Sequence, residues 1–248
     1  MLIGEQCHDV YVYGTCDRLS PEAPIPIFKP SREEYFLGMA QNVKSNLESF
    51  GITVEFITDW LKDIVKTRYI DERYNHQFLR VDEDPIVLPF GRGSLYDPNY
   101  DVNSYDAVVI SDYDKGFLSK EKIFEIVSSS NVPVFIDSKK TELPNSNCFL
   151  KINEAESKLL KGEYNNTIVT KGPGGAEYNG KTYQGFKSDM CDVCGAGDTF
   201  LSALVYFYLK CGTIEKAIPY ANKAASIAVS NPGTYCLNTK DIEVINGI

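Results

Sequence analysis

The sequence predicts an α/β protein whose central sheet is mostly parallel, with helices on both faces and a small additional set of strands. Two observations predict this class. Short β-branched apolar runs at 106–116, 132–140 and 166–175 each end in polar residues and alternate with helical patterns, as in a parallel sheet. Residues 1–30 instead alternate apolar and polar side chains between glycines and prolines, which is typical of strands with one exposed face.

Length and periodicity predict one domain over residues 1–248. A chain of 248 residues with 43% hydrophobic side chains can bury a sizeable core. The alternating stretches predict lid strands at about 9–30 and 66–81 beside this domain. A parallel sheet binds ligands at the carboxyl ends of its strands, so we expect the functional residues there.

The first helix and strand of the main body are expected after residue 38. Val43, Leu47 and Phe50 follow helical spacing, and Gly51 stands where a helix C-cap is expected. A strand over 54–58 follows.

Three further helices are expected later in the chain. Ser119 is a candidate N-cap for a helix whose stripe contains Ile123, Ile126 and Val127. The last part of the chain predicts helices over 198–210 and 215–230, and Pro219 predicts a late start or a kink in the second.

Charge and composition exclude several classes of function. Lys plus Arg minus Asp plus Glu is 25 − 34 = −9, which opposes general binding to nucleic acid or anionic lipid. Seven scattered cysteines and an amino end without an apolar signal region indicate a cytoplasmic protein. The longest apolar stretch is too short to span a membrane. Only two histidines are present, without metalloprotease spacing.

The segment 192–200, DVCGAGDTF, carries the clearest chemistry. Its glycine turn can present the amides of Ala196, Gly197 and Asp198 at a helix N-terminus, which favours an anion. An acid beside an anion site fits a general base for phosphoryl transfer. The alternative is an ordinary helix in which Asp198 is only the N-cap.

The segment and its spacing from other motifs resemble the ribokinase-like (PfkB) family of sugar kinases, over nearly the whole chain. That family has a three-layer fold with a small β-strand lid, and an Asp-x-x-Gly-Ala-Gly-Asp signature that Asp192 and 195–198 match. Cys194 stands where threonine is common. The resemblance implies that Asp198 is the base and that Gly195, Ala196 and Gly197 form the anion hole.

The resemblance also implies an ATP site and a sugar site. Asn153 and Glu156 match an Asn-x-x-Glu element that acts on magnesium indirectly, through the phosphates or water. The other nucleotide residues that it implies are Thr170, Gly172, Gly175, Asn222 and Gly233, and the sugar residues are Asp9, Gly38 and Asn42. The expected cofactors are ATP and Mg²⁺. Leu37 replaces the first glycine of the sugar-binding element.

Lysines at the ends of the apolar runs are further candidates for phosphate binding. Lys115 and Lys139 follow strands at the expected ligand end, although solvated surface charge is the usual role of lysine. The other candidates have plain alternatives too. Asn153 and Glu156 can cap a helix, Gly172 to Gly175 can be a hairpin turn, and Cys191-x-x-Cys194 has no second pair for zinc.

Within the family, three segments resemble the kinases of D-glycero-β-D-manno-heptose 7-phosphate. They are DRLSPEAPIPIF (17–28), SDYDKG (111–116) and FIDSKK (135–140). Bifunctional relatives fuse this kinase to a nucleotidyltransferase with paired histidines, and we expect only the kinase half here. We therefore expect a kinase that phosphorylates a sugar or sugar phosphate.

One region departs from the family. After Asp59, only residues 60–65 precede KTRYIDERYN, where the family has a further helix and strand. We expect this trimmed edge or the lid to form a homodimer, since unpaired strand edges seek partners. The shortening also keeps an alternative open, a catalytically impaired sugar- or nucleotide-binding protein. A dinucleotide-dependent oxidoreductase is disfavoured, because no apolar strand directly precedes the glycines.

Overall fold

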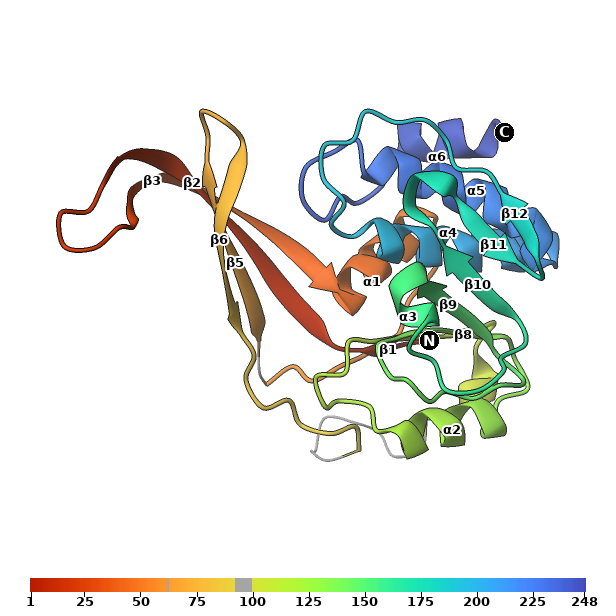
Figure 1. Ribbon diagram of the computed structural model, residues 1–248. Helices are drawn as coiled ribbons and strands as arrows, with labels where there is room; N and C mark the ends of the chain where they lie inside the picture. Colours follow the sequence, from red (N-terminus) through yellow and green to blue (C-terminus); the bar gives the residue numbers. More distant parts are fainter. Residues whose placement is uncertain (62, 92–99) are drawn as a thin grey trace.

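The chain forms two sheets, of which the larger is covered by helices and the smaller projects to one side (Figure 1). The computed structural model describes residues 1–61, 63–91 and 100–248. The large sheet has eight strands in the order β12-β11-β10-β9-β8-β7-β1-β4, and the small sheet has four in the order β3-β2-β5-β6.

The large sheet is mostly parallel, as the sequence predicts. The neighbours β4, β1, β7, β8, β9 and β10 all pair in parallel, and β11 and β12 add an antiparallel edge. Its strands are β1 (Leu2–Gly4), β4 (Phe56–Ile57), β7 (Val108–Asp112), β8 (Val134–Ser138), β9 (Phe149–Asn153), β10 (Thr167–Thr170), β11 (Ala176–Tyr178) and β12 (Lys181–Tyr183). Three expected runs thus contain β7, β8 and β10, whereas the sequence analysis does not predict β9, and the strand expected over 54–58 contains only β4.

The helices lie mainly where the periodicity predicts them. They are α1 (Ala40–Ser49), α2 (Lys120–Ser129), α3 (Glu154–Ser157), α4 (Ala196–Cys211), α5 (Ile214–Ala228) and α6 (Thr239–Asn246), with 3₁₀ turns η1 (Val102–Ser104) and η2 (Gly172–Gly174). Ser119 caps α2 by accepting from the amide of Lys122. The expected late start of the helix with Pro219 is wrong, because α5 begins at Ile214.

Side chains of alternate strand positions enter two separate cores. Val109 and Phe135 pack in one core with α4 and α5, and Ile110 and Ile136 pack in the other with α2. Figure 1 accordingly shows α4 and α5 on one side of the sheet and α2 on the other. In the part of the chain that the structure describes, no helix has the length and apolarity that a membrane span requires.

The small sheet has an inner face toward the main body and an outer face away from it. Its strands are β2 (Gln6–Leu19), β3 (Pro26–Met39), β5 (Ile64–Asp71) and β6 (His76–Glu83). On the inner face, the Tyr11 hydroxyl lies 3.2 Å from Asp192 Oδ2 of the main body. The large exposed apolar side chains of the outer face are Tyr35, Leu37, Leu79 and Val81.

Candidate active site

A cavity of about 900 Å³ lies where β8, β9 and β10 end and α4 begins. Ten of the residues that the sequence analysis selected line it: Lys139, Asn153, Thr170, Gly172, Gly175, Gly195, Ala196, Gly197, Asp198 and Asn222. They come from β8, β9, β10 and the helices α4 and α5, or from residues directly after them. This is the carboxyl edge of the parallel strands, where an open α/β sheet is expected to bind ligands.

The glycine turn before α4 gives the first amides of the helix no side-chain partner, and the amide of Ala196 makes a long contact, 3.4 Å, with the carbonyl of Val193. The N-cap of α4 is Gly195, which has no side chain to accept from these amides. Gly195 has a φ of 72°, and a Cβ there would lie 2.6 Å from Asn42 Nδ2, so a larger residue is excluded. Asp198 is therefore not the N-cap, and the alternative of a plain Asp-capped helix is wrong.

Asp198 is held by two donors from distant parts of the chain. Asn42 Nδ2 donates to its Oδ2 over 3.1 Å, and the Tyr113 hydroxyl donates to its Oδ1 over 2.8 Å. Burial, together with the charge of Asp137, raises the pKa of Asp198 to about 6, although the hydrogen bonds from Asn42 and Tyr113 oppose this rise. A buried carboxylate with a pKa near neutrality is suited to accept a proton.

A buried ion pair lies beside the start of α4. Lys151 Nζ of β9 lies 2.5 Å from Asp137 Oδ2 of β8, and both residues line the cavity. A Cβ on Gly197 would lie 2.8 Å from Lys151 Nζ, so the ammonium is close to the first turn of α4. The site thus adds a cation to the positive end of the helix dipole, which suits a polyanion such as triphosphate.

Asn153 and Glu156 form the capping box of α3. The Asn153 side chain accepts from the amides of Ala155 and Glu156, and the Glu156 carboxylate accepts from the amide of Asn153 and pairs with Lys139. The alternative that Asn153 and Glu156 cap a helix is therefore confirmed. Asn153 also lines the cavity, whereas Glu156 is not among its lining residues.

Few carboxylates are gathered for direct metal ligation. Among residues 1–61, 63–91 and 100–248, no group of three or more His, Cys, Asp or Glu side chains could hold a metal ion. Asp137 Oδ1 is buried without a hydrogen-bond partner, and its residue lines the cavity. That oxygen fits a hydrated cation bound with the phosphates, since a buried carboxylate oxygen without a partner is costly.

The predicted sugar residues lie where the small sheet meets the main body. Asp9 of β2 is buried and pairs with Arg68 of β5, whose Nη1 lies 2.5 Å from Asp9 Oδ1. A Cβ on Gly38 would lie 2.2 Å from Asp9 Oδ2, so glycine is required at this crossing. Asn42 connects this region to Asp198. Leu37 lies on the opposite face of β3 from Gly38, because it pairs with His8 while Gly38 pairs with Cys7.

Besides Glu156, Asp9, Gly38 and Asn42, two more selected residues lie outside the cavity lining. Lys115 pairs with Asp84 over 2.6 Å and is not among the residues that line the cavity, and its expected role in substrate binding stays a prediction. Gly233 donates its amide to Asp192 Oδ2 over 3.1 Å and packs against Phe36. It therefore joins the loop before α4 to the small sheet.

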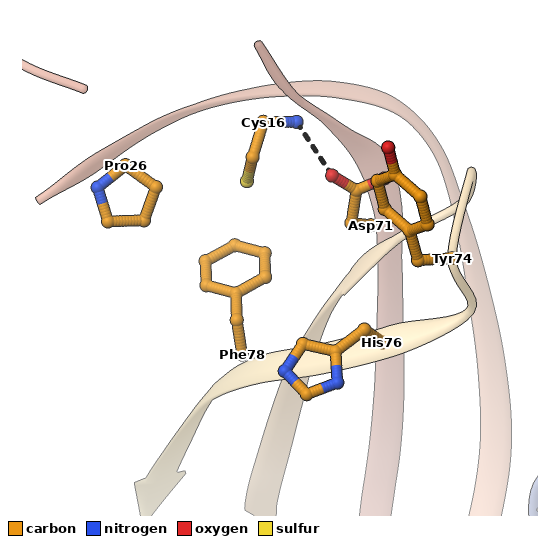
Figure 2. Close-up of a pocket in the computed structure, with 6 residues that line it drawn as sticks. All are labelled: Cys16, Pro26, Asp71, Tyr74, His76 and Phe78. Carbon is orange, nitrogen blue, oxygen red and sulfur yellow. Dashed lines mark hydrogen bonds between the residues drawn. The ribbon is translucent and has the colours of Figure 1, made fainter. Parts of the chain in front are cut away.

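A second cavity, of about 300 Å³, lies at the far end of the small sheet (Figure 2). Its residues are Cys16, Pro26, Asp71, Tyr74, His76 and Phe78, and the amide of Cys16 donates to Asp71 Oδ2 over 3.1 Å. The unusual segment 17–28 forms the ends of β2 and β3 here, at the tip that projects farthest from the main body in Figure 1.

Four functional residues were missed by the sequence analysis: Arg68, Tyr113, Asp137 and Lys151. Tyr113 and Asp137 lie inside SDYDKG and FIDSKK, so the rule that polar residues after apolar strands carry chemistry could have found them. Lys151 was detectable as a lysine inside the apolar run FLKIN. Arg68 gave no local signal, because its partner Asp9 is 59 residues away in sequence.

Sequence comparison finds one family and a set of relatives. Residues 141–240 match the pfkB family of carbohydrate kinases. Bifunctional protein HldE of a Nitratiruptor species is 31% identical over 302 positions, which cover 98% of this chain and 64% of that protein. Bifunctional protein HldE of Campylobacter concisus is 30% identical, with 98% and 63% covered. The chain thus spans less than two thirds of the length of these relatives.

Solved structures share the fold over the whole chain. Ribokinase from Thermotoga maritima gives a TM-score of 0.73 at 15% identity, covering 100% of this chain and 98% of that one. A carbohydrate kinase from Agrobacterium tumefaciens gives 0.75 at 18% identity, covering 99% and 96%. The expected ribokinase-like fold is confirmed.

Proposed function

Residues 141–240 match the pfkB family of carbohydrate kinases, and we propose that the chain is a kinase of this family that transfers the γ-phosphate of ATP to a hydroxyl of a sugar or sugar phosphate. The observation that carries the proposal is Asp198. Its carboxylate lines the same cavity as the glycine turn and the nucleotide motifs, and burial raises its pKa to about 6. The candidate base and the candidate anion site therefore line the same cavity.

The reaction follows from this geometry. A sugar hydroxyl gives its proton to Asp198 while its oxygen attacks the γ-phosphorus, and the bond to the bridging oxygen of ADP breaks. The amides of Ala196 and Gly197 and the Lys151 ammonium stabilise the charge on the transferred group. Asn42 keeps the carboxylate oriented through its hydrogen bond to Oδ2.

Nucleotide binding is assigned to the part of the cavity away from the small sheet. Thr170, Gly172, Gly175 and Asn222 line it, and the Asn222 amide is anchored to the carbonyls of Tyr183 and Gln184. Asn153 and Asp137 Oδ1, which has no hydrogen-bond partner and lies 3.9 Å from Lys139 Nζ, would hold Mg²⁺ through water or phosphate. Bound Mg²⁺ would neutralise charge on the phosphates.

The acceptor is proposed to be heptose 7-phosphate or a similar sugar phosphate. SDYDKG supplies Tyr113 and FIDSKK supplies Asp137 and Lys139, so two of the three segments that resemble the heptose kinases border the cavity. Asp9, Gly38 and Asn42 would orient the sugar at the junction with the small sheet. Lys139 lines the cavity and pairs with Glu156, and it would exchange this partner to bind a sugar phosphate.

The alternative is a binding protein of the same fold with impaired catalysis. It is suggested by Leu37 and by the short segment 60–65, of which residue 62 lies outside the described residues. The Leu37 side chain lies on the outer face of the small sheet, so its replacement of glycine leaves the face toward Asp198 unchanged. This weakens the alternative.

The test is a coupled assay of ATP consumption with heptose 7-phosphate, other sugar phosphates and free sugars. We expect turnover with a sugar phosphate that requires Mg²⁺ and that the Asp198→Asn protein lacks. Binding of a sugar by calorimetry without ATP turnover in the wild type would support the alternative instead.

We also propose that the chain forms a homodimer through its small sheet. The outer face exposes Tyr35 and Leu37 on the edge strand β3 and Leu79 and Val81 on the edge strand β6, which a second copy would cover. Sedimentation at micromolar concentration tests this, and a monomer there would contradict it.

A further inference from the structure

Tyr113 lies at the point where the proposed acceptor hydroxyl must bind. It follows β7, lines the cavity and donates its hydroxyl hydrogen to Asp198 Oδ1 over 2.8 Å. Asn42 occupies the other oxygen of the same carboxylate. A carboxylate oxygen accepts more than one hydrogen bond, so a sugar hydroxyl that gives its proton to Asp198 can approach Oδ1 beside the hydroxyl of the cavity-lining Tyr113.

The tyrosine is held from several sides. Its amide donates to Glu5 Oε2 over 2.8 Å, which fixes the turn after β7. Lys66 Nζ of the small sheet lies 5.4 Å from the ring centroid, and Lys139 Nζ of the main body lies 5.3 Å from it. The ring is thus contacted by cations from both parts of the molecule, at a distance typical of cation–π interactions.

The Tyr113 hydroxyl stays protonated at neutral pH, so it can donate to Asp198. Burial, and next the negative charge of Asp198, raise the pKa of Tyr113 well above its ordinary value. A neutral phenol beside a buried carboxylate is a strong hydrogen-bond donor and a poor proton acceptor. The Tyr113 hydroxyl can therefore hydrogen-bond to the Asp198 carboxylate without itself accepting the proton of the sugar hydroxyl.

We propose that Tyr113 is a positioning residue that holds Asp198 and keeps water from its Oδ1 until the acceptor hydroxyl takes that place. The proposal rests on the proposed function. Without this protection, a water oxygen could attack the γ-phosphorus, pass its proton to Asp198 and release ADP and phosphate. Tyr113 thereby favours transfer to sugar over hydrolysis of ATP.

The test compares Tyr113→Phe with Tyr105→Phe as the matched control. Tyr105 also donates its hydroxyl to a carboxylate, Glu55 Oε2 over 2.6 Å, but it precedes β7 and so lies at the opposite end of that strand from Tyr113. We expect Tyr113→Phe to raise the ratio of sugar-independent ATP hydrolysis to sugar phosphorylation by about tenfold or more, and Tyr105→Phe to leave it unchanged. An unchanged ratio in both variants would overturn the proposal.

A second readout does not depend on turnover. The pH midpoint of the Asp198 side-chain carboxyl ¹³C resonance is expected near 6 in the wild type. It should rise by about one pH unit in Tyr113→Phe, because a hydrogen bond to the charged form is lost. An unmoved midpoint would overturn the positioning role. If the wild type phosphorylates no sugar, the proposed function fails, while hydrolysis without sugar and this midpoint still decide the role of Tyr113.

Discussion

Two buried ion pairs flank Asp198, and they belong to different sheets. Lys151 and Asp137 join β9 to β8 in the large sheet, and Arg68 and Asp9 join β5 to β2 in the small sheet, each over 2.5 Å. All four side chains are at least nine-tenths buried. The two ion pairs have the same nitrogen–oxygen distance and similar burial, but they lie in different sheets.

The difference lies in how each pair is supported. The large sheet is packed on both faces, so Lys151 and Asp137 are fixed by the same strands that form the core. In the small sheet, Arg68 Nη2 also lies 3.6 Å from Cys194 Sγ in the loop before α4. The pair of the large sheet, on the proposed phosphate side, is therefore fixed within one sheet, and the pair of the small sheet, on the proposed acceptor side, lies at the contact between that sheet and the main body.

The largest effect is expected from Lys151→Met. It removes the nearer of the two cations beside the buried Asp137 and leaves only Lys139, whose Nζ lies 3.9 Å from Asp137 Oδ1, so the free energy of unfolding should fall by about 3–5 kcal/mol in urea denaturation. The control is Lys122→Met, which removes a pair with Glu125 on the surface of α2 and should cost at most about 1 kcal/mol. Equal losses in the two variants would contradict the view that the phosphate side depends on a buried pair.

The next effect concerns the base between the two pairs. Asp198→Asn should lower turnover by about 100-fold or more while ATP and sugar still bind, because the proton has no acceptor. In the wild type the carboxylate must be ionised to act, so the rate should fall as the pH drops below about 6. Initial rates between about pH 5 and pH 9 measure this, and retained turnover in the variant would exclude Asp198 as the base.

The smallest effect is expected from Arg68→Gln on the acceptor side. Losing the partner of Asp9 should raise the KM for sugar about tenfold and leave the KM for ATP within about twofold, since the nucleotide motifs lie elsewhere in the cavity. The control is Arg80→Gln, because Arg80 pairs with Asp82 on the same sheet in a more exposed position. Equal changes in both KM values would show that the two sides are not separate.

The nucleotide side was more predictable than the acceptor side, because its residues follow strands and begin helices. Gly195 to Asp198 are consecutive, and Asn153 and Thr170 end neighbouring parallel strands. Their meeting at one edge follows from parallel pairing alone. The sequence marks Lys151 only as a lysine inside an apolar run. Its role in the site depends on the ion pair with Asp137 of the neighbouring strand, which the sequence does not show.

The sequence by itself determined the fold class, the family and the glycine turn with its acid, because these depend on periodicity and short motifs. Tertiary structure alone decided which groups share the acid: Asn42 and Tyr113 are 156 and 85 residues away from Asp198. The tertiary structure also decided that Lys115 pairs with Asp84 and that Arg68 forms an ion pair with Asp9. A hydrogen bond or ion pair between distant segments leaves no periodic trace in a sequence, since only the folded chain brings its two partners together.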